Sequence, residues 1–210
     1  MTDELREELL KFEAAVQAAK PILGRYNDEV DATPHLKTLL VLGFMSQVIE
    51  HHEAMLVLIT EGMTSSAFAL ARSIFEGMYR GLWIDRAATE AEIEHFIKKD
   101  KIQISISTMA KEIDKAYGSG NSFDDLKKRE WNALNSYTHN GMLQLGRRFT
   151  ERELAYTDAQ RAEIMSAVTK CVLMLIALFL SRRGFVHECS EVEKLISSCG
   201  PMSEGRQLSG

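Results

Sequence analysis

The placement of proline constrains the fold of this chain more than any other feature. Proline occurs at Pro21, Pro34 and Pro201 and nowhere else. Because proline breaks helix interiors, the whole stretch between Pro34 and Pro201 lacks the strongest helix breaker. Apolar residues recur there at the three- and four-residue spacing of an α-helix, and strand-like alternation is almost absent. The sequence therefore predicts an all-α fold, an up-down bundle of about six to seven helices.

The ends of the expected helices follow from capping and turn residues. Thr89 with Glu92 forms a predicted capping box, and Thr157 and Ser122 are predicted N-caps. The expected helices cover approximately residues 2–26 with a bend at Pro21, 34–62, 64–85, 89–117, 122–138, 157–183 and 188–198, with a short helical piece after Gly141. No repeat or composition shift divides the chain, so residues 1–199 are expected to form one domain and residues 200–210 a loose tail.

Composition bounds the class of protein. Hydrophobic residues make up 45% and charged residues 26% of the 210 residues, which is typical of a globular domain. The formal net charge of −5 argues against binding to long nucleic-acid duplexes. Three cysteines without a C-x-x-C pair favour a reducing compartment, and the acidic N-terminus lacks the pattern of a signal peptide. We therefore expect a cytoplasmic protein.

Two of the expected helices, 64–85 and 157–183, are apolar on nearly all sides. The most apolar run, residues 171–180, is shorter than the roughly 18 residues that a membrane span needs, so no membrane association is expected. Helices of this kind are buried in a bundle core or in an oligomer interface. This pattern favours a homodimer.

Within the helix 64–85, charged residues recur at a spacing of four: Arg72, Glu76 and Arg80. They share one sector of the helix with Tyr79 and Trp83. Because an isolated buried guanidinium costs several kcal/mol, we expect Arg72 to pair with Glu76 and Arg80 to need a further acceptor. Two interpretations remain open, a buried ion network that fixes helix packing or the wall of a ligand pocket.

A second polar cluster follows at the end of the helix 122–138. Its members are Asn135, Tyr137, His139 and Asn140, with Arg147 and Arg148 shortly downstream. The helix dipole favours a cationic His139 at this position. Together these residues suit an anion, and a histidine beside arginines is an acid/base pair for phosphodiester chemistry without metal. The alternative is a histidine that only caps the helix.

The sequence offers little support for a metal or a cofactor. In "EHHE", residues 50–53, the two histidines point about 100° apart on a helix, and a di-iron bundle needs two Glu-x-x-His pairs where this chain has one, Glu92 to His95. The sequence contains neither a phosphate-binding glycine loop nor the GxSxG nucleophile motif. We expect no metal and no cofactor.

Two motifs of the sequence resemble those of a known protein family. "ALARSIFEGMYRGLW" and, some fifty residues later, "LNSYTHNGMLQLGRR" resemble a family of uncharacterised bacterial helical proteins over about residues 35–185. The pattern is more remotely similar to HEPN proteins, small helical bundles of toxin-antitoxin and abortive-infection systems, many of which dimerise and cleave RNA without metal. The HEPN signature, an arginine followed after four to six residues by a histidine, matches Arg182 to His187, whereas His139 has no arginine at that upstream spacing.

The resemblance implies one hypothesis, and the helical pattern alone supports another. In the first, a HEPN-like protein acts on RNA or a nucleotide in stress or phage defence, with an antitoxin-like protein as a partner. Arg72 and Arg80 then hold phosphate, Glu76 orients Arg72 and His139 is the acid/base. Trp83, Asn135, Tyr137, Asn140, Arg147 and Arg148 are the remaining candidate ligand-binding residues. In the second, the same residues form a structural network in a non-enzymatic binding or dimerisation module.

Overall fold

The computed structural model describes residues 1–29, 36–139, 141–147 and 155–199. These residues form helices and contain no strand, which confirms the all-α prediction. The helices are α1 (Asp3–Glu29), α2 (Leu36–Thr60), α3 (Thr64–Arg86), α4 (Glu90–Lys99), α5 (Ile106–Tyr117), α6 (Ser122–Thr138), α7 (Met142–Arg147), α8 (Asp158–Arg182) and α9 (Val186–Ser198). The expected tail, residues 200–210, lies outside the described residues, and the division into one domain and a tail stays a prediction.

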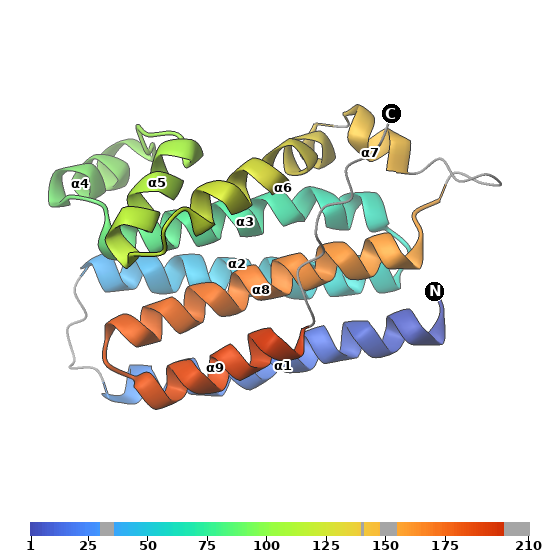
Figure 1. The fold of residues 1–210 in the computed structure, drawn as a ribbon, viewed down its shortest axis with the longest axis horizontal. Coiled ribbons are helices and arrows are strands. Elements are labelled where there is room, and N and C mark those ends of the chain that lie inside the picture. Colours follow the sequence, from blue (N-terminus) through green and yellow to red (C-terminus); the bar gives the residue numbers. More distant parts are fainter. Residues whose placement is uncertain (30–35, 140, 148–154, 200–210) are drawn as a thin grey trace.

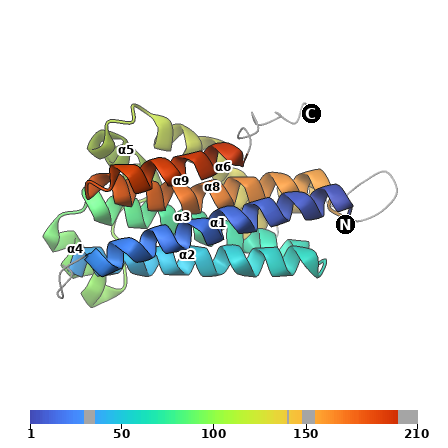
Figure 2. The same cartoon turned by 90° about the horizontal axis from the view of Figure 1, so that it is seen from below.

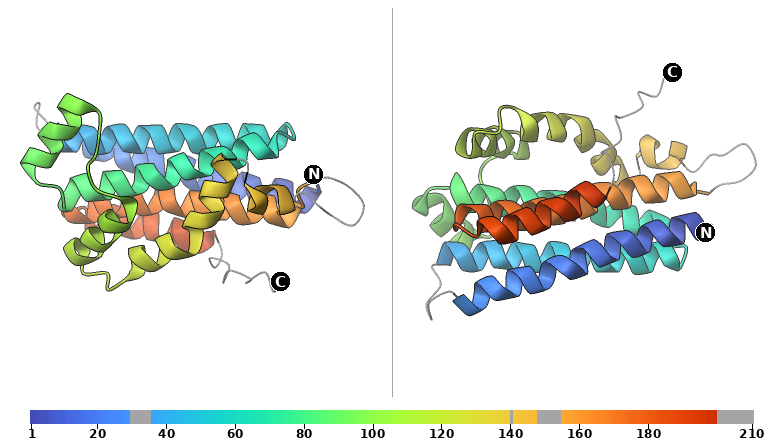
Figure 3. Two further views of the ribbon diagram at one scale, coloured as in Figure 1. Left: turned by 90° about the horizontal axis from the view of Figure 1, so that it is seen from above. Right: turned by 60° about the horizontal axis from the view of Figure 1, so that its bottom comes forward.

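Helix α3 lies in the middle of the molecule (Figure 1). It packs against α2 and α8 on one side and against α5 and α6 on the other. Helices α1 and α9 pack on α8 and lie together in the view from below (Figure 2). The segment from α4 to α7 crosses over α3, as the left view of Figure 3 shows. The helix that carries the charged triplet is therefore covered on both sides.

Two glycines allow the close packing of α3. A Cβ on Gly77 would lie 2.5 Å from Cγ1 of Val48 in α2, and a Cβ on Gly81 would lie 3.0 Å from Cδ1 of Leu175 in α8. Both distances are shorter than ordinary van der Waals contact, so a side chain at either position would push a neighbouring helix away. The glycines therefore serve the close approach of the helices around α3.

The helix expected over residues 89–117 is two helices, which corrects that prediction. Helix α4 ends after Lys99, where Asp100 takes the left-handed conformation with φ of 50°. Helix α5 begins after Ser105, whose side chain accepts a hydrogen bond from the backbone N–H of Thr108. Asp tolerates the left-handed region better than most residues, and a Ser-x-x-Thr start is a capping pattern. The chain therefore changes direction between α4 and α5 instead of continuing as one helix.

The other predicted caps have mixed outcomes. Thr89 and Thr157 cap α4 and α8, each in a reciprocal capping box with the residue three positions on. Ser122 is not the cap of α6. Asn121 occupies the N-cap position without a side-chain bond, and the Ser122 hydroxyl donates to the Ser119 carbonyl instead.

Helix α8 forms much of the core. Within the described part of the chain it is the one helix long and apolar enough to cross a membrane, with a mean hydropathy of 2.2 over its most apolar 18-residue window. The uncharged run of residues 171–180 is shorter than a membrane span. The 18-residue stretch is longer because it includes up to two charged residues. Because 72% of the window is buried inside the bundle, α8 has the burial expected of a core helix.

Candidate functional site

One carboxylate joins the two arginines of α3. The Arg72 Nε donates to Oε1 of Glu76 over 2.7 Å, and the Arg80 Nη2 donates to Oε2 over 2.8 Å. The predicted Arg72 to Glu76 pair is confirmed, and the acceptor that Arg80 needs is the same carboxylate. The Glu76 side chain is 18% exposed, so these charge-assisted hydrogen bonds lie in a partly desolvated setting where they are stronger than at an open surface.

Arg72 also contacts the second sequence motif. Its Nη1 lies 2.9 Å from Nε2 of His139. Helix α6 ends at Thr138, and the backbone N–H of His139 donates to the Asn135 carbonyl as the C-cap. Since a guanidinium only donates, this contact as a hydrogen bond has Nε2 as its acceptor. Such a geometry favours the tautomer with the proton on Nδ1, and the cationic histidine expected from the helix dipole stays a prediction.

A tryptophan that the sequence reasoning missed completes the surroundings of Arg72. The guanidinium carbon of Arg72 lies over the Trp131 ring of α6, 5.2 Å from its centroid, and Lys127 Nζ lies 5.9 Å from the same ring. Such cation–π contacts are favourable by about 0.5–1 kcal/mol where solvent reaches them. Arg72 thus contacts Glu76 of α3, Trp131 of α6 and His139, the residue directly after α6.

A cleft of about 600 Å³ opens beside this network. Its size is typical of sites for small molecules. Helices α2 to α6 and the connection between α4 and α5 contribute to its wall. The lining residues are Phe44, Gln47, Arg72, Glu76, Arg80, Phe96, Asp100, Lys101, Ile102, Ile104, Ser105, Ile106, Met109 and Trp131. Because α4 and α5 are separate helices, the residues between them reach the cleft, which a continuous helix would not have allowed.

Several predicted site residues lie elsewhere. Trp83 is 1% exposed and its indole N–H donates to Oε2 of Glu112 over 2.6 Å. Tyr137 is 2% exposed and its ring packs against Phe68 at a centroid distance of 5.2 Å. Asn135 is half-buried on α6 and does not line the cleft. Within the structure described, these three residues belong to the packing around α3 and α6.

The remaining predicted residues cannot be placed at the site. Asn140 and Arg148 lie outside the described residues, and for Arg147 the backbone alone is described, as the last residue of α7.

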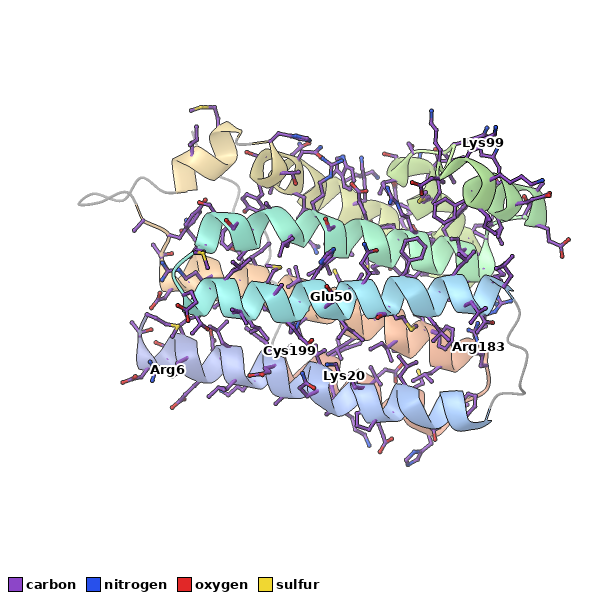
Figure 4. The ribbon with its side chains drawn as sticks, turned by 180° about the vertical axis from the view of Figure 1, so that it is seen from behind. Arg6, Lys20, Glu50, Lys99, Arg183 and Cys199 are labelled. Carbon is purple, nitrogen blue, oxygen red and sulfur yellow. The ribbon has the colours of Figure 1, made fainter. Side chains whose placement is uncertain are left out.

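The two residues of the HEPN signature lie in separate ion pairs. Arg182 Nε is 3.7 Å from the buried Asp85 carboxylate, which Arg183 also contacts at 3.0 Å. Arg183 is labelled in Figure 4, at the end of the molecule away from the N-terminus. His187 is 81% exposed and lies 3.7 Å from Glu191. In this chain, Arg182 and His187 make no contact with the cleft.

His52 of "EHHE" lies in the core. His52 is fully buried, and its Nε2 lies 2.8 Å from the Thr169 hydroxyl. That hydroxyl already donates to the Met165 carbonyl, so His52 donates from Nε2, and its Nδ1 is a buried acceptor without a partner among the described residues. Burial lowers the pKa of His52 to about 4. The described residues contain no group of three His, Cys, Asp or Glu side chains placed to hold a metal ion.

Comparison with known proteins identifies the family. The chain belongs to the family described as a family of unknown function (DUF6988), whose members it matches over residues 45–202. That range contains both sequence motifs and most of the cleft wall. Neither the curated proteins nor the solved structures contain a match to this chain.

Proposed function

We propose that this member of the DUF6988 family is a HEPN-like protein that acts on RNA or a nucleotide at the cleft beside α3. The observation that carries the proposal is the position of Arg72, which lines the cleft with Glu76 and Trp131 and reaches His139 just outside the cleft lining. A guanidinium beside an imidazole combines an anion-binding group with a base. Both groups serve phosphodiester chemistry without a metal.

The proposed reaction uses Nε2 of His139 as the base. When a phosphate of the substrate accepts the Arg72 hydrogen bond, Nε2 of His139 is released with a free lone pair. It then takes the proton of a ribose 2′-hydroxyl, whose oxygen attacks the adjacent phosphorus. The bond between phosphorus and the 5′-oxygen breaks, and the leaving oxygen takes a proton from water. The hydroxide so formed takes the proton from the His139 imidazolium, and a cyclic phosphate and a 5′-hydroxyl remain. Arg72 and Arg80 stabilise the charge that develops on the phosphate oxygens, while Glu76 keeps both guanidiniums in place.

The proposal extends to the setting of the protein. A cytoplasmic homodimer acting in stress or phage defence, with an antitoxin-like protein partner, agrees with the remote HEPN similarity of the two motifs. The odd number of cysteines, without a C-x-x-C pair, supports the cytoplasmic part of this setting.

Incubation of the purified chain with total RNA in EDTA tests the proposal. Wild type is expected to cleave RNA, and His139→Ala is expected to lose cleavage while keeping its melting temperature, because His139 is exposed. His187→Ala is the matched control, since this exposed histidine lies in the HEPN signature and not at the cleft. Loss of cleavage in His187→Ala with full activity in His139→Ala would move the chemistry away from the cleft and overturn the proposal.

A second candidate function is a non-enzymatic binding or dimerisation module. It is favoured by a specific observation: Glu76 uses one oxygen for each arginine, and Arg72 has a partner for Nε, for Nη1 and for the face of its guanidinium. An arginine paired as fully as Arg72 also serves to fix α6 on α3. Absence of cleavage in wild type, together with a large fall in melting temperature for Arg72→Ala, supports this candidate.

A further inference from the structure

The two arginines of the cleft, Arg72 and Arg80, differ in exposure and in the number of residues that each contacts. The Arg72 side chain is 25% exposed and is held by Glu76, His139 and Trp131. The Arg80 side chain is 40% exposed and bonds Glu76 through Nη2, its one ion-pair contact among the described residues. The exposed part of the Arg80 guanidinium can therefore donate to a ligand, whereas most donors of Arg72 are already bonded within the protein.

A second cation faces the same cleft. Lys101 follows Asp100, whose left-handed conformation ends α4 and turns the chain toward the cleft wall. Lys101 is exposed and makes no hydrogen bond or ion pair with another described residue. Across the whole lining, three cationic side chains face two carboxylates, so one positive charge is in excess. Such a site favours a ligand of low negative charge.

The rest of the wall combines apolar side chains with the polar Gln47, Asp100 and Ser105. Phe44 of α2 and Phe96 of α4 lie side by side as a stacked pair, with ring centroids 6.2 Å apart. Ile102, Ile104 and Ile106 extend this apolar part along the connection to the start of α5. Apolar contact supplies binding energy in proportion to the area that the ligand buries. An inorganic anion alone would leave the apolar part of the wall in water.

We propose that Arg80 and Lys101 bind the anionic head of a small amphipathic ligand, and that its apolar body lies against Phe44, Phe96 and Ile104. The head is a phosphate or a carboxylate, and the body is one ring system or one short chain, since the cleft holds about 600 Å³. This inference rests on the cleft assigned under the proposed function and names its ligand class. A nucleoside monophosphate and a medium-chain carboxylate share this chemistry, and the experiment distinguishes them.

Isothermal titration calorimetry of the full chain tests the inference with three probes: adenosine monophosphate, octanoate and inorganic phosphate. One of the amphipathic probes is expected to bind about tenfold or more tightly than inorganic phosphate. Lys101→Met is expected to weaken that binding about tenfold through the loss of a charge-assisted contact. Lys99→Met is the matched control, because Lys99 lies two residues away at the end of α4, does not line the cleft, and is labelled in Figure 4.

A second variant separates the head from the body. Ile104→Ala is expected to weaken the amphipathic probe severalfold while leaving any binding of inorganic phosphate unchanged. The inference is overturned if Lys101→Met binds as tightly as Lys99→Met, if phosphate binds as tightly as both amphipathic probes, or if no probe binds at about 1 mM.

The outcomes also separate this inference from the proposed function. RNA cleavage that depends on His139, without binding of either amphipathic probe, removes the inference and leaves the proposed function standing. Binding that depends on Lys101, without cleavage of RNA in EDTA, retains the inference and removes the catalytic part of the proposed function.

Discussion

Arg72 and His139 are 67 residues apart in the chain, and Nη1 of the arginine lies 2.9 Å from Nε2 of the histidine. This contact joins the two motifs of the sequence at one point beside the cleft. Because a guanidinium cannot accept a hydrogen bond, the contact favours Nε2 of the histidine as the acceptor. The same atom is the base in the proposed reaction.

Arg72→Ala is expected to destabilise the protein more than Arg80→Ala. Removal of Arg72 eliminates contacts with Glu76, His139 and Trp131 and is expected to lower the free energy of unfolding by about 1–2 kcal/mol. Arg80 is more exposed and has one ion-pair partner among the described residues, so its loss is expected to cost less than about 1 kcal/mol. Urea unfolding of the two variants measures the difference, and equal losses would contradict the unequal roles of the two arginines.

Gly77→Ala is expected to destabilise the protein by about 1–3 kcal/mol, because the new methyl group meets Val48 across the packing of α2 and α3. Gly43→Ala is the matched control in α2. Nothing lies within 4 Å of a Cβ there, so alanine is expected to stabilise the helix by up to about 1 kcal/mol. Thermal unfolding should therefore shift in opposite directions for the two variants. A shift in the same direction would show that the packing around Gly77 is looser than described.

The stability of the protein is expected to fall as the pH drops from about 6.5 to 4 through the titration of His52. Burial lowers the pKa of His52 to about 4 from the ordinary value of 6.5. Between these values the unfolded chain binds a proton that the folded chain does not, so the free energy of unfolding rises with pH in this window. At pH 7 His52 is neutral in both the folded and the unfolded states, so it no longer lowers the free energy of unfolding. The loss on acidification amounts to at most about 3 kcal/mol.

His52→Leu tests that expectation. The substitution removes the titrating group and the buried Nδ1 that has no partner, and the Thr169 hydroxyl still donates to Met165. Urea unfolding at pH 7 and at pH 4.5 should show a smaller pH dependence in the variant than in wild type. The same slope in both proteins would assign the acid sensitivity to carboxylates elsewhere.

Sedimentation velocity measures the predicted homodimer. The chain has a mass of 23.7 kDa, and the expected result is a species of twice that mass whose share falls on dilution. A single species at the mass of the chain over the whole concentration range would rule out the dimer.

The sequence by itself determined the features that depend on local spacing. The absence of proline between Pro34 and Pro201 left the chain free to form helices, and the caps at Thr89 and Thr157 follow from side chains that reach backbone N–H groups three residues away. The Arg72 to Glu76 pair follows from the i,i+4 neighbourhood on any helix surface. Each of these interactions closes within one turn of backbone.

Tertiary structure decided which residues meet across helices. Trp131 carried no signal as a partner of Arg72, since their contact depends on how α6 lies on α3. Lys101 reaches the cleft because Asp100 ends α4, a break that the helical periodicity of the surrounding residues concealed. Conversely, the helical period places Trp83 in the polar sector of α3, but its indole N–H donates to Glu112 of α5 and does not face the cleft. Spacing fixes the direction of a side chain from its own helix, whereas the packing of neighbouring helices fixes what it meets there.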